Sequence, residues 1–317
     1  MPAIEVEDLH KTYGHVEAVR GVSFRVAEGE VFALLGPNGA GKTTTVEILE
    51  GYRARDSGRA SVLGHDPARG ERELKTRIGI VLQQTGVEEF LTVRETIDMY
   101  RGYYPHPRPT DEIVELVGLK PKQHTRITKL SGGQKRRLDV AIALAGDPDL
   151  LFLDEPTTGF DPGARRNAWT LVRNLAHLGK TIFLTTHYMD EAQYLADRVA
   201  VIAGGVIVAE GPPSTLAGRE TAATRIRFRV PGGAELPAVA AVESTSTADG
   251  VVQFTTREPT RALSEITSWA VGRGIELQGL EVARPSLEDV YLELTGGDAE
   301  PPEEAAPAPG RRRGRRM

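Results

Sequence analysis

Eight consecutive residues near the start of the chain constrain its fold more than any other segment. Residues 36–43 read GPNGAGKT, which fits the phosphate-binding pattern of spaced glycines followed by lysine and a hydroxyl residue. The apolar run 31–35 precedes them, and a helix-like stretch, 44–49, follows. The segment therefore predicts a strand, a glycine-rich loop and a helix whose N-terminal dipole favours a bound anion.

The residues of this loop offer three kinds of contact to a polyphosphate. Glycine lets backbone N–H groups approach the phosphates without a Cβ in the way. Lys42 can reach the β- and γ-phosphates, and the Thr43 hydroxyl can ligate Mg²⁺. The residues that we expect to bind nucleotide here are Gly36, Asn38, Gly39, Ala40, Gly41, Lys42, Thr43 and Thr44.

Length and composition allow two domains, one of them large. The 317 residues are 40% hydrophobic and 26% charged, and they include no cysteine, so neither a disulfide nor a thiolate metal site can form. We find no uninterrupted apolar stretch long enough to span a bilayer, and no signal-peptide pattern at the start. Any membrane association is therefore expected to depend on a partner or on the protein surface.

The charge of the chain is unevenly distributed. Residues 311–317 contain five arginines, and removing them from a net charge of -5 leaves -10 for the rest. An acidic body argues against general nucleic-acid binding by the folded part. We also expect no specific nucleic-acid partner. Residues 298–309 are rich in Pro, Ala and Glu, so we expect 298–317 to be a disordered tail. Its arginines can contact anionic lipid or RNA, but a solvated tail without a specific partner is the favoured interpretation.

Apolar runs separated by helical patterns predict an α/β fold with a mostly parallel sheet and helices on both sides. Residues 4–6 and 22–26 alternate between apolar and polar, which indicates short strands. Leu138, Ala141, Ile142 and Ala145 follow helical spacing. The buried strands are expected at 31–35, 78–82, 150–153, 181–185 and 199–202.

Two further regions differ from this alternation. From about residue 84 the chain has helix-like segments, a break at 103–107 and no strong strand, which predicts a helical insertion over about 84–145 within a domain of residues 1–218. Residues 224–230 and 251–255 alternate again, a helix-like run covers 260–272, and 275–277 resemble a strand. We therefore expect a small α+β domain over residues 219–297.

An apolar stripe lies at the C-terminal end of this predicted small domain. Leu287, Val290, Tyr291 and Leu294 lie on one face of a predicted helix. Docking of this stripe onto its own domain is favoured over contact with a substrate.

Polar residues end four of the predicted strands. In open α/β sheets, ligands bind beyond the carboxyl ends of the strands, and the first strand here ends at the phosphate loop. The second ends at Gln83, whose amide oxygen can reach Mg²⁺ or the attacking water. The third ends at Asp154, placed to hold the metal, and at Glu155, which can polarise a water for attack on the γ-phosphate. The fourth ends at His187, which can contact that phosphate and orient the water. A lone carboxylate pair or histidine favours a structural role, but four such ends at one sheet edge favour chemistry.

A second anion site is predicted at Ser131-Gly132-Gly133-Gln134, which opens a helix. Ser131 is a good N-cap, and its hydroxyl and the following N–H groups can bind an anion. Taken alone, a tight turn with a cap is an equally good interpretation.

Together these motifs resemble the ATP-binding subunits of ABC transporters. Residues 36–44 resemble the Walker A loop, and 150–156 resemble Walker B with its catalytic glutamate. Residues 130–134 match the LSGGQ signature of the family. The remaining matches are Gln83 at the Q-loop, Asp161 in the D-loop segment 159–161, His187 as the switch histidine, and Tyr13 as the ring of the adenine-stacking loop 11–14.

The resemblance covers about residues 4–210 and implies both a fold and a reaction. The fold would be that of a P-loop NTPase with a mostly parallel core sheet, N-terminal antiparallel strands and a helical insertion, followed by the small C-terminal domain. The reaction would be ATP hydrolysis with ATP and Mg²⁺ as cofactors. The implied catalytic residues are Glu155, His187, Lys42 and Gln83, and the implied metal ligands are Thr43, Gln83 and Asp154.

The resemblance also implies partners. In this family the signature of one subunit completes the phosphate loop of another, which implies a head-to-tail homodimer with two ATP molecules at the interface. Segments 91–95, 157–162, 185–192 and 285–296 resemble subunits of ABC-2-type exporters, the last of them in the daunorubicin-resistance group. A peripheral position on the cytoplasmic face of the cell membrane, beside a separate permease, follows, with an unidentified cargo such as a drug or a lipid-like compound.

Two other functions compete with this one. A soluble ABC protein acting on ribosomes or nucleic acid is disfavoured, because the chain holds one cassette and no heptad run. A nucleotide-controlled binding module without turnover is disfavoured because Glu155 and His187 are both present.

Overall fold

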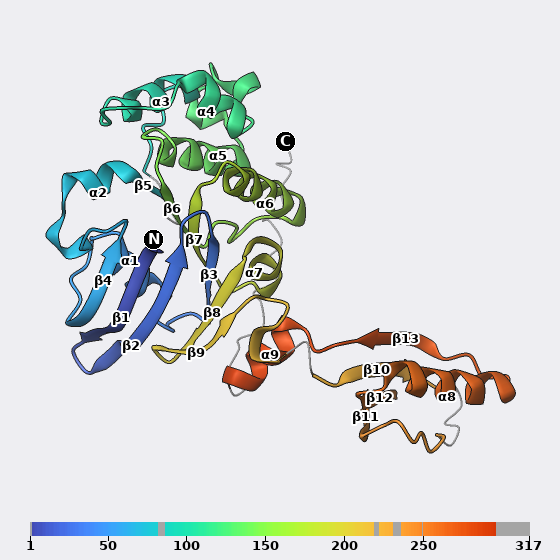
Figure 1. Ribbon diagram of the computed structural model, residues 1–317. Coiled ribbons are helices and arrows are strands. Elements are labelled where there is room, and N and C mark those ends of the chain that lie inside the picture. The colour runs from blue at the N-terminus through green and yellow to red at the C-terminus, as the bar shows by residue number, and fades with distance from the viewer. Residues whose placement is uncertain (1, 82–85, 219–221, 231–235, 249, 296–317) are drawn as a thin grey trace, which may run out of the picture.

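The computed structural model describes residues 2–81, 86–218, 222–230, 236–248 and 250–295 (Figure 1). Their strands form a six-stranded, a three-stranded and a four-stranded sheet. Gln83 and the predicted tail 298–317 lie outside these residues. Within the described ranges, no helix combines the length and the apolar character needed to cross a membrane.

The central sheet has the strand order β5-β6-β7-β3-β8-β9. Its first five strands are parallel and β9 is antiparallel at the edge, so the predicted mostly parallel sheet is confirmed and β9 is an addition to it. The bounds are β3 (Val31–Leu35), β5 (Ile78–Val81), β6 (Leu150–Asp154), β7 (Thr181–Thr186), β8 (Arg198–Ala203) and β9 (Val206–Gly211).

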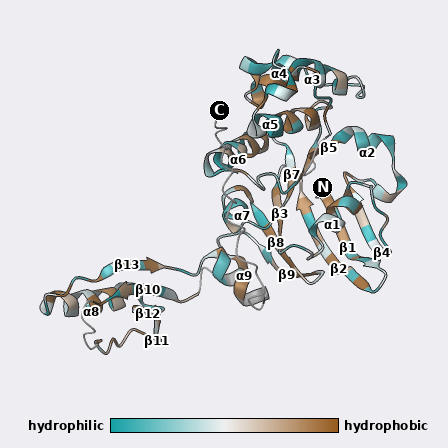
Figure 2. Cartoon of the chain, turned by 180° about the vertical axis from the view of Figure 1, so that it is seen from behind, coloured by the Kyte–Doolittle hydropathy of each residue, from teal (hydrophilic) through white to brown (hydrophobic). Residues whose placement is uncertain are grey.

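Strand β3 shows why these runs are apolar throughout. Phe32 and Leu34 face one hydrophobic core, whereas Val31, Ala33 and Leu35 face the other. Because successive side chains of a strand point to opposite faces, a strand covered on both sides needs apolar residues at every position. Figure 2 shows the hydrophobic colouring along these central strands and the hydrophilic colouring of the outlying helix α2 (Arg72–Arg77).

The N-terminal strands form an antiparallel sheet of order β2-β1-β4, as predicted. The expectation of short strands is wrong, because β1 (Pro2–Tyr13) and β2 (Val16–Ala27) each have 12 residues. Asp8 has φ +49°, and the β1–β2 register shifts beside it. Such an irregularity interrupts the alternation of apolar and polar residues without ending the strand, so the pattern underestimates its length. Strand β4 (Ser57–Val62) completes the sheet.

Helices cover the central sheet, and others form the predicted insertion. Between Gly86 and Leu130 the described chain contains helical segments and no named strand. Figure 1 shows α3 and α4 above α5, away from the small N-terminal sheet. The helices are α1 (Lys42–Leu49), α3 (Val93–Arg101), α4 (Thr110–Leu116), α5 (Gly132–Ala143), α6 (Pro162–His177) and α7 (Met189–Leu195), with short 3₁₀ turns at Lys120–Lys122 and Ile127–Lys129.

The small C-terminal α+β unit is an antiparallel sheet of order β11-β12-β10-β13 with one helix. Ile226, Phe228 and Phe254 of the sheet pack with Ala262 and Ile266 of the helix. The elements are β10 (Thr224–Arg229), β11 (Ser244–Ala248), β12 (Val251–Thr256), α8 (Pro259–Gly272) and β13 (Gln278–Ala283).

The strand predicted at 275–277 is wrong by a few residues. Gly274 has φ +65°, and the N–H of Ile275 donates to the carbonyl of Ala270 at 2.9 Å. This is the hydrogen bond that closes a helix after a left-handed residue. Ile275 therefore closes the C-terminal end of α8, which itself ends at Gly272, and the strand begins only at Gln278.

The last helix, α9 (Leu287–Thr295), packs apolar residues against the large domain, and its Asp289 forms an ion pair with Arg225 of β10 in the small unit. Leu287 and Tyr291 are 1% and 3% exposed and belong to the core that includes Leu195 of α7. The expectation that this stripe docks onto its own domain is therefore wrong for these two residues. The side chains of Val290 and Leu294 are not among those described. Because α9 returns to α7, the small unit is held at both of its ends (Figure 1).

We expect Leu287→Ala to lower the free energy of unfolding by roughly 2–4 kcal/mol, because it removes a buried side chain and leaves a cavity. Urea denaturation followed by circular dichroism measures this. Leu292→Ala on the same helix is the matched control, since Leu292 is 37% exposed. Equal losses for the two variants would show that α9 is not docked as described.

Candidate functional site

The register of three strands brings the predicted site residues to one sheet edge. Leu35 of β3 pairs with Thr186 of β7, and Asp154 of β6 pairs with Thr185. The phosphate loop, Asp154 with the following glutamate, and His187 therefore leave adjacent strands side by side. This is the arrangement that the strand-end argument predicted, apart from Gln83, which lies outside the described residues.

The phosphate loop approaches its neighbours too closely for most side chains. A Cβ at Gly36 would lie 2.4 Å from the carbonyl oxygen of Ile202, and one at Gly41 would lie 2.3 Å from that of Ala18. Gly41 also has φ +104°, a conformation that favours glycine. Packing alone thus requires glycine at both positions. At Gly39, with φ +79°, a Cβ would have open space, so the reason for glycine there is the backbone conformation.

Lys42 reaches back over this loop. Its Nζ donates to the carbonyls of Gly36 at 2.8 Å and Pro37 at 3.1 Å. The side chain is 4% exposed, and burial lowers the pKa of Lys42, with Glu155 opposing the shift. A buried ammonium at the phosphate loop is suited to an anionic ligand.

The other predicted nucleotide residues lie around the loop and at one end of the N-terminal sheet. Tyr13, at the end of β1, is 38% exposed. The guanidinium of Arg53 lies 5.2 Å and the Nζ of Lys11 lies 5.6 Å from its ring centroid. The remaining loop residues divide into the exposed Asn38, Gly39 and Thr43, the half-buried Thr44 and the buried Ala40.

Thr185 orients both carboxyl residues that follow β6. Its hydroxyl donates to Oδ1 of Asp154 at 2.5 Å and accepts the backbone N–H of Glu155 at 3.1 Å. Glu155 has φ +44°, a left-handed conformation that is uncommon outside glycine and clusters at functional sites. This conformation turns the glutamate out of the strand direction and toward the phosphate loop.

Glu155 lies between Lys42 and His187. Its Oε1 is 3.5 Å from Nζ of Lys42 and 3.3 Å from Nδ1 of His187, and Thr158 donates to its Oε2 at 3.1 Å. The close contact with His187 and the charge of Lys42 outweigh burial and lower the pKa of Glu155 to about 2. Lys42 and His187, two of the four predicted catalytic residues, therefore both contact a third, the ionised Glu155.

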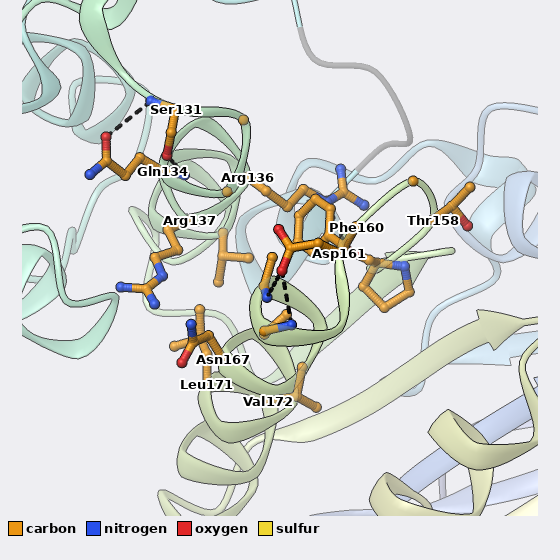
Figure 3. Close-up of a pocket in the computed structure, with 18 of the residues that line it drawn as sticks. Ser131, Gln134, Arg136, Arg137, Thr158, Phe160, Asp161, Asn167, Leu171 and Val172 are labelled. Carbon is orange, nitrogen blue, oxygen red and sulfur yellow. Dashed lines mark hydrogen bonds between the residues drawn. The ribbon is translucent and has the colours of Figure 1, made fainter. Parts of the chain in front are cut away.

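Both polar side chains of the signature segment cap the start of helix α5. The backbone N–H of Gln134 donates to the Ser131 hydroxyl at 3.3 Å, and Gln134 Oε1 accepts the N–H of Ser131 at 3.0 Å (Figure 3). This reciprocal cap leaves the N–H groups of Gly132 and Gly133 at the first turn for other acceptors.

Asp161 caps the neighbouring helix α6. Its Oδ1 accepts the N–H groups of Gly163 and Ala164, each at 2.9 Å (Figure 3). A pocket of about 760 Å³ lies between this cap and the first turn of α5. The two predicted motifs therefore share one cavity, whose lining includes Ser131, Gly132, Gly133, Gln134, Arg137, Asp161 and Asn167.

The structure divides the predicted site residues into two groups. Lys42, Asp154, Glu155 and His187 meet at the sheet edge, whereas the signature and Asp161 line the pocket. No residue of the phosphate loop lines that pocket.

The sequence analysis missed two residues that hold the site. Thr185 orients both carboxyl residues, and Arg136 of α5 donates to the carbonyls of Asp154 at 3.2 Å and Pro156 at 3.3 Å. Thr185 lies at the polar end of the apolar run that forms β7. Only the pairing of Thr185 with Asp154 in the sheet reveals the role of this threonine. Arg136 carries no local signal, because its acceptors lie about 20 residues away.

The residues present fit Mg²⁺ held jointly with a phosphate. Among the described residues, no group of three or more His, Cys, Asp and Glu side chains gathers to hold a metal. Mg²⁺ is commonly bound by one or two carboxylates together with substrate phosphates and water. Asp154 supplies a carboxylate of this kind, and Thr43 adds a hydroxyl oxygen.

This sheet, with a phosphate loop beside an ionised glutamate, defines a P-loop NTPase. Residues 19–158 match the ABC transporter family, and residues 224–286 match the family described as "ABC transporter domain-containing protein-like, C-terminal domain". The chain belongs to the ATP-binding proteins of ABC transporters, and it is an ATPase whose hydrolysis of ATP is coupled to transport.

Several curated proteins resemble the chain over most of its length. Daunorubicin resistance ATP-binding protein DrrA3 of Streptomyces coeruleorubidus is 37% identical over 306 residues, covering 93% of this chain and 96% of that protein. Linearmycin resistance ATP-binding protein LnrL of Bacillus subtilis is 33% identical over 306 residues, with 92% and 98% covered. Nod factor export ATP-binding protein I of Rhizobium etli is 45% identical over 221 residues, with 68% and 70% covered.

Solved structures of ABC transporter cassettes match about two thirds of the chain. The cassette CbiO1 of Clostridium perfringens, described as part of an ABC transporter complex, is 29% identical with a TM-score of 0.61, covering 67% of this chain and 89% of that one. The ADP conformation of the ABC transporter cassette MJ1267 is 26% identical with a TM-score of 0.60, with 67% and 91% covered. The predicted ABC ATPase fold is therefore confirmed.

The low pKa of Glu155 predicts how its contribution to stability varies with pH. Because the folded pKa of about 2 lies below the ordinary value of 4.5, ionised Glu155 stabilises the folded state above pH 4.5. That contribution falls as the pH decreases toward 2. We expect the difference in unfolding free energy between wild type and Glu155→Gln to shrink below about pH 4.5, as measured by urea denaturation at a series of pH values.

The exposed Glu112→Gln on α4 controls for loss of a carboxylate elsewhere. A difference for Glu155→Gln that stayed constant from about pH 6 to about pH 3.5 would contradict the contacts with Lys42 and His187.

Proposed function

We propose that the chain is the ATP-hydrolysing subunit of an ABC exporter and serves a separate ABC-2-type membrane permease. Curated relatives covering more than nine-tenths of the chain are named for resistance to daunorubicin and linearmycin, and a relative covering 68% of it is named for Nod factor export. These names support export over import and a drug or lipid-like cargo. A peripheral position on the cytoplasmic face of the cell membrane follows from this partnership.

Within one chain, the sheet edge would bind and hydrolyse the nucleotide. The phosphate loop and Lys42 would bind the β- and γ-phosphates, and Tyr13 would stack on the adenine. Glu155 would accept a proton from the attacking water, and His187 would hold that water and the γ-phosphate in line. The 3.3 Å contact between Glu155 and His187 supports this pairing of roles.

The metal would be held by a few oxygen ligands of this chain. Asp154 and Thr43 are the described candidates, and we propose Gln83 as the third. Mg²⁺ bound there would neutralise charge on the β- and γ-phosphates. The hydroxyl of Thr185, at 2.5 Å from Asp154, would keep that carboxylate aimed at the site.

The observation that carries the proposal is the separation of the phosphate loop from the signature pocket, while Glu155 lines a smaller pocket together with Gly132 of the signature. The sheet edge has a base and a phosphate loop, while the pocket beside α5 has helix N–H groups and no residue of that loop. Each group lacks what the other supplies, since a helix N-terminus stabilises the charge that develops on a γ-phosphate. A head-to-tail homodimer would place the signature of one copy over the nucleotide of the other.

ATP would then stabilise the closed dimer, and hydrolysis would weaken it. The helical insertion after Gln83 would transmit this cycle of closing and opening to the permease.

We expect Glu155→Gln to lower ATP turnover at least a hundredfold, because the amide cannot accept the proton of the attacking water. ATP binding is retained, so this variant accumulates as a dimer with ATP and Mg²⁺. Phosphate release measures turnover, and light scattering after size-exclusion chromatography measures the dimer. Lys42→Ala, in contrast, binds ATP weakly and stays monomeric.

Lys122→Ala, at an exposed position of the insertion, is the control, and we expect it to keep both ATP turnover and dimer formation. Wild-type phosphate release by Glu155→Gln would reject Glu155 as the base. A variant that binds ATP and Mg²⁺ but never dimerises would reject the two-copy site.

The exporter assignment predicts a stable complex with a polytopic membrane protein. Affinity capture of the full chain from detergent-solubilised membranes of its native host should recover such a protein, and ATPase activity should rise in the complex. Recovery of ribosomes or nucleic acid in its place would reject an exporter role.

A further inference from the structure

A buried carboxylate on α7 lies at the junction of the two groups of site residues. Glu191 is fully buried, and its Oε1 accepts the Thr157 hydroxyl at 2.8 Å and the Trp169 indole N–H at 3.0 Å. Thr157 belongs to the loop between Glu155 and Asp161, and Trp169 lies on α6. One oxygen atom therefore joins α7, that loop and α6.

The three segments carry different parts of the proposed reaction. Helix α7 begins two residues after His187, and the loop of Thr157 begins at Glu155. Helix α6 begins at the cap formed by Asp161, in the pocket that would receive the partner's nucleotide. Glu191 thus connects groups that would act on the chain's own ATP with groups that would act on the ATP of the other copy.

Further side-chain contacts join α6 and α7. The rings of Trp169 and Tyr194 stack with centroids 5.1 Å apart. Arg165 lies 4.3 Å from the ring centroid of Tyr188 and 3.5 Å from Asp190. The two helices, which contact each other along these side chains, lie side by side in Figure 1.

The signature helix α5 is tied to the same loop. Arg136 donates to the backbone carbonyls of Asp154 and Pro156, immediately before Thr157. A displacement of the loop therefore reaches α5 through Arg136 and α7 through Glu191.

We propose that Glu191 is a positioning residue for ATP hydrolysis, holding Glu155 and His187 in fixed relation to the signature and Asp161. The inference rests on the proposed two-copy site. Glu191 lies apart from the phosphates and acts through the residues that it hydrogen-bonds, so it should affect kcat rather than nucleotide binding. Burying a carboxylate is unfavourable without donors, and Thr157 and Trp169 supply two of them.

The test compares variants that remove the acceptor or a single donor. Glu191→Ala removes the acceptor, Glu191→Gln keeps an acceptor oxygen, and Thr157→Val and Trp169→Phe each remove one donor. Thr170→Val on the exposed face of α6 is the matched control, because its hydroxyl bonds only within its own helix. ATP hydrolysis by the full chain gives kcat and KM for each variant, and thermal unfolding verifies that each is folded.

We expect Glu191→Ala to lower kcat at least tenfold, about 1.4 kcal/mol, with KM within about twofold. Glu191→Gln should stay within about threefold of wild type, because burial raises the pKa of Glu191 and the amide presents the same acceptor. Thr157→Val and Trp169→Phe should each lower kcat, but neither should lower it further in the Glu191→Ala background, since all act through one oxygen.

Three results would overturn the inference: wild-type kcat in Glu191→Ala, an equal loss in Glu191→Gln, or additive losses in the double variants. If Glu191→Ala does not fold, unchanged kcat in both donor variants overturns it as well. Wild-type turnover by Glu155→Gln would reject the proposed base whatever the Glu191 variants do, so the two failures are distinguishable.

Discussion

The pairing of β7 with β3 and β6 is the constraint on which the site depends. It sets Thr185 opposite Asp154 and Thr186 opposite Leu35, so the three strands end together. The Thr185 hydroxyl can then serve Asp154 as a donor and the N–H of Glu155 as an acceptor. A one-residue slip of β7 would turn that hydroxyl to the other face of the sheet. The apolar side chains that fill both cores therefore fix the geometry of the carboxylates.

The same arrangement sets the electrostatics of Glu155. A carboxylate with a pKa of about 2 is a weak base near neutral pH. One cause of that low pKa is Lys42, which also donates to two backbone carbonyls. A lysine ammonium has three donors, so a phosphate that engaged Lys42 would compete with Glu155 for it. Substrate binding would then raise the basicity of Glu155 at the moment when a base is needed.

The sequence predicts the parts of this structure that depend on local pattern. Runs such as 31–35 are apolar at every position because they face two cores, and the phosphate loop has glycines where backbone packing requires them. Contacts between distant segments leave no such pattern. Arg136 reaches carbonyls about 20 residues away, α9 docks on a helix of the other domain, and the irregularity at Asp8 hides the length of β1.

The caps of α5 and α6 show what the pocket can offer to an anion. The Ser131 and Gln134 side chains are engaged with each other's backbone, and Asp161 is engaged with its own helix. The Asp161 carboxylate, which accepts two N–H groups, is a poor partner for phosphate, because the carboxylate and the phosphate both carry negative charge. The donors that remain are the N–H groups of Gly132 and Gly133, the hydroxyl hydrogen of Ser131 and the amide of Gln134. All of them lie at the positive end of the α5 dipole, and glycine at two of the positions lets a phosphate approach the backbone. The pocket therefore offers donors suited to a phosphate but includes no residue of this chain's own phosphate loop, as the proposed two-copy site requires.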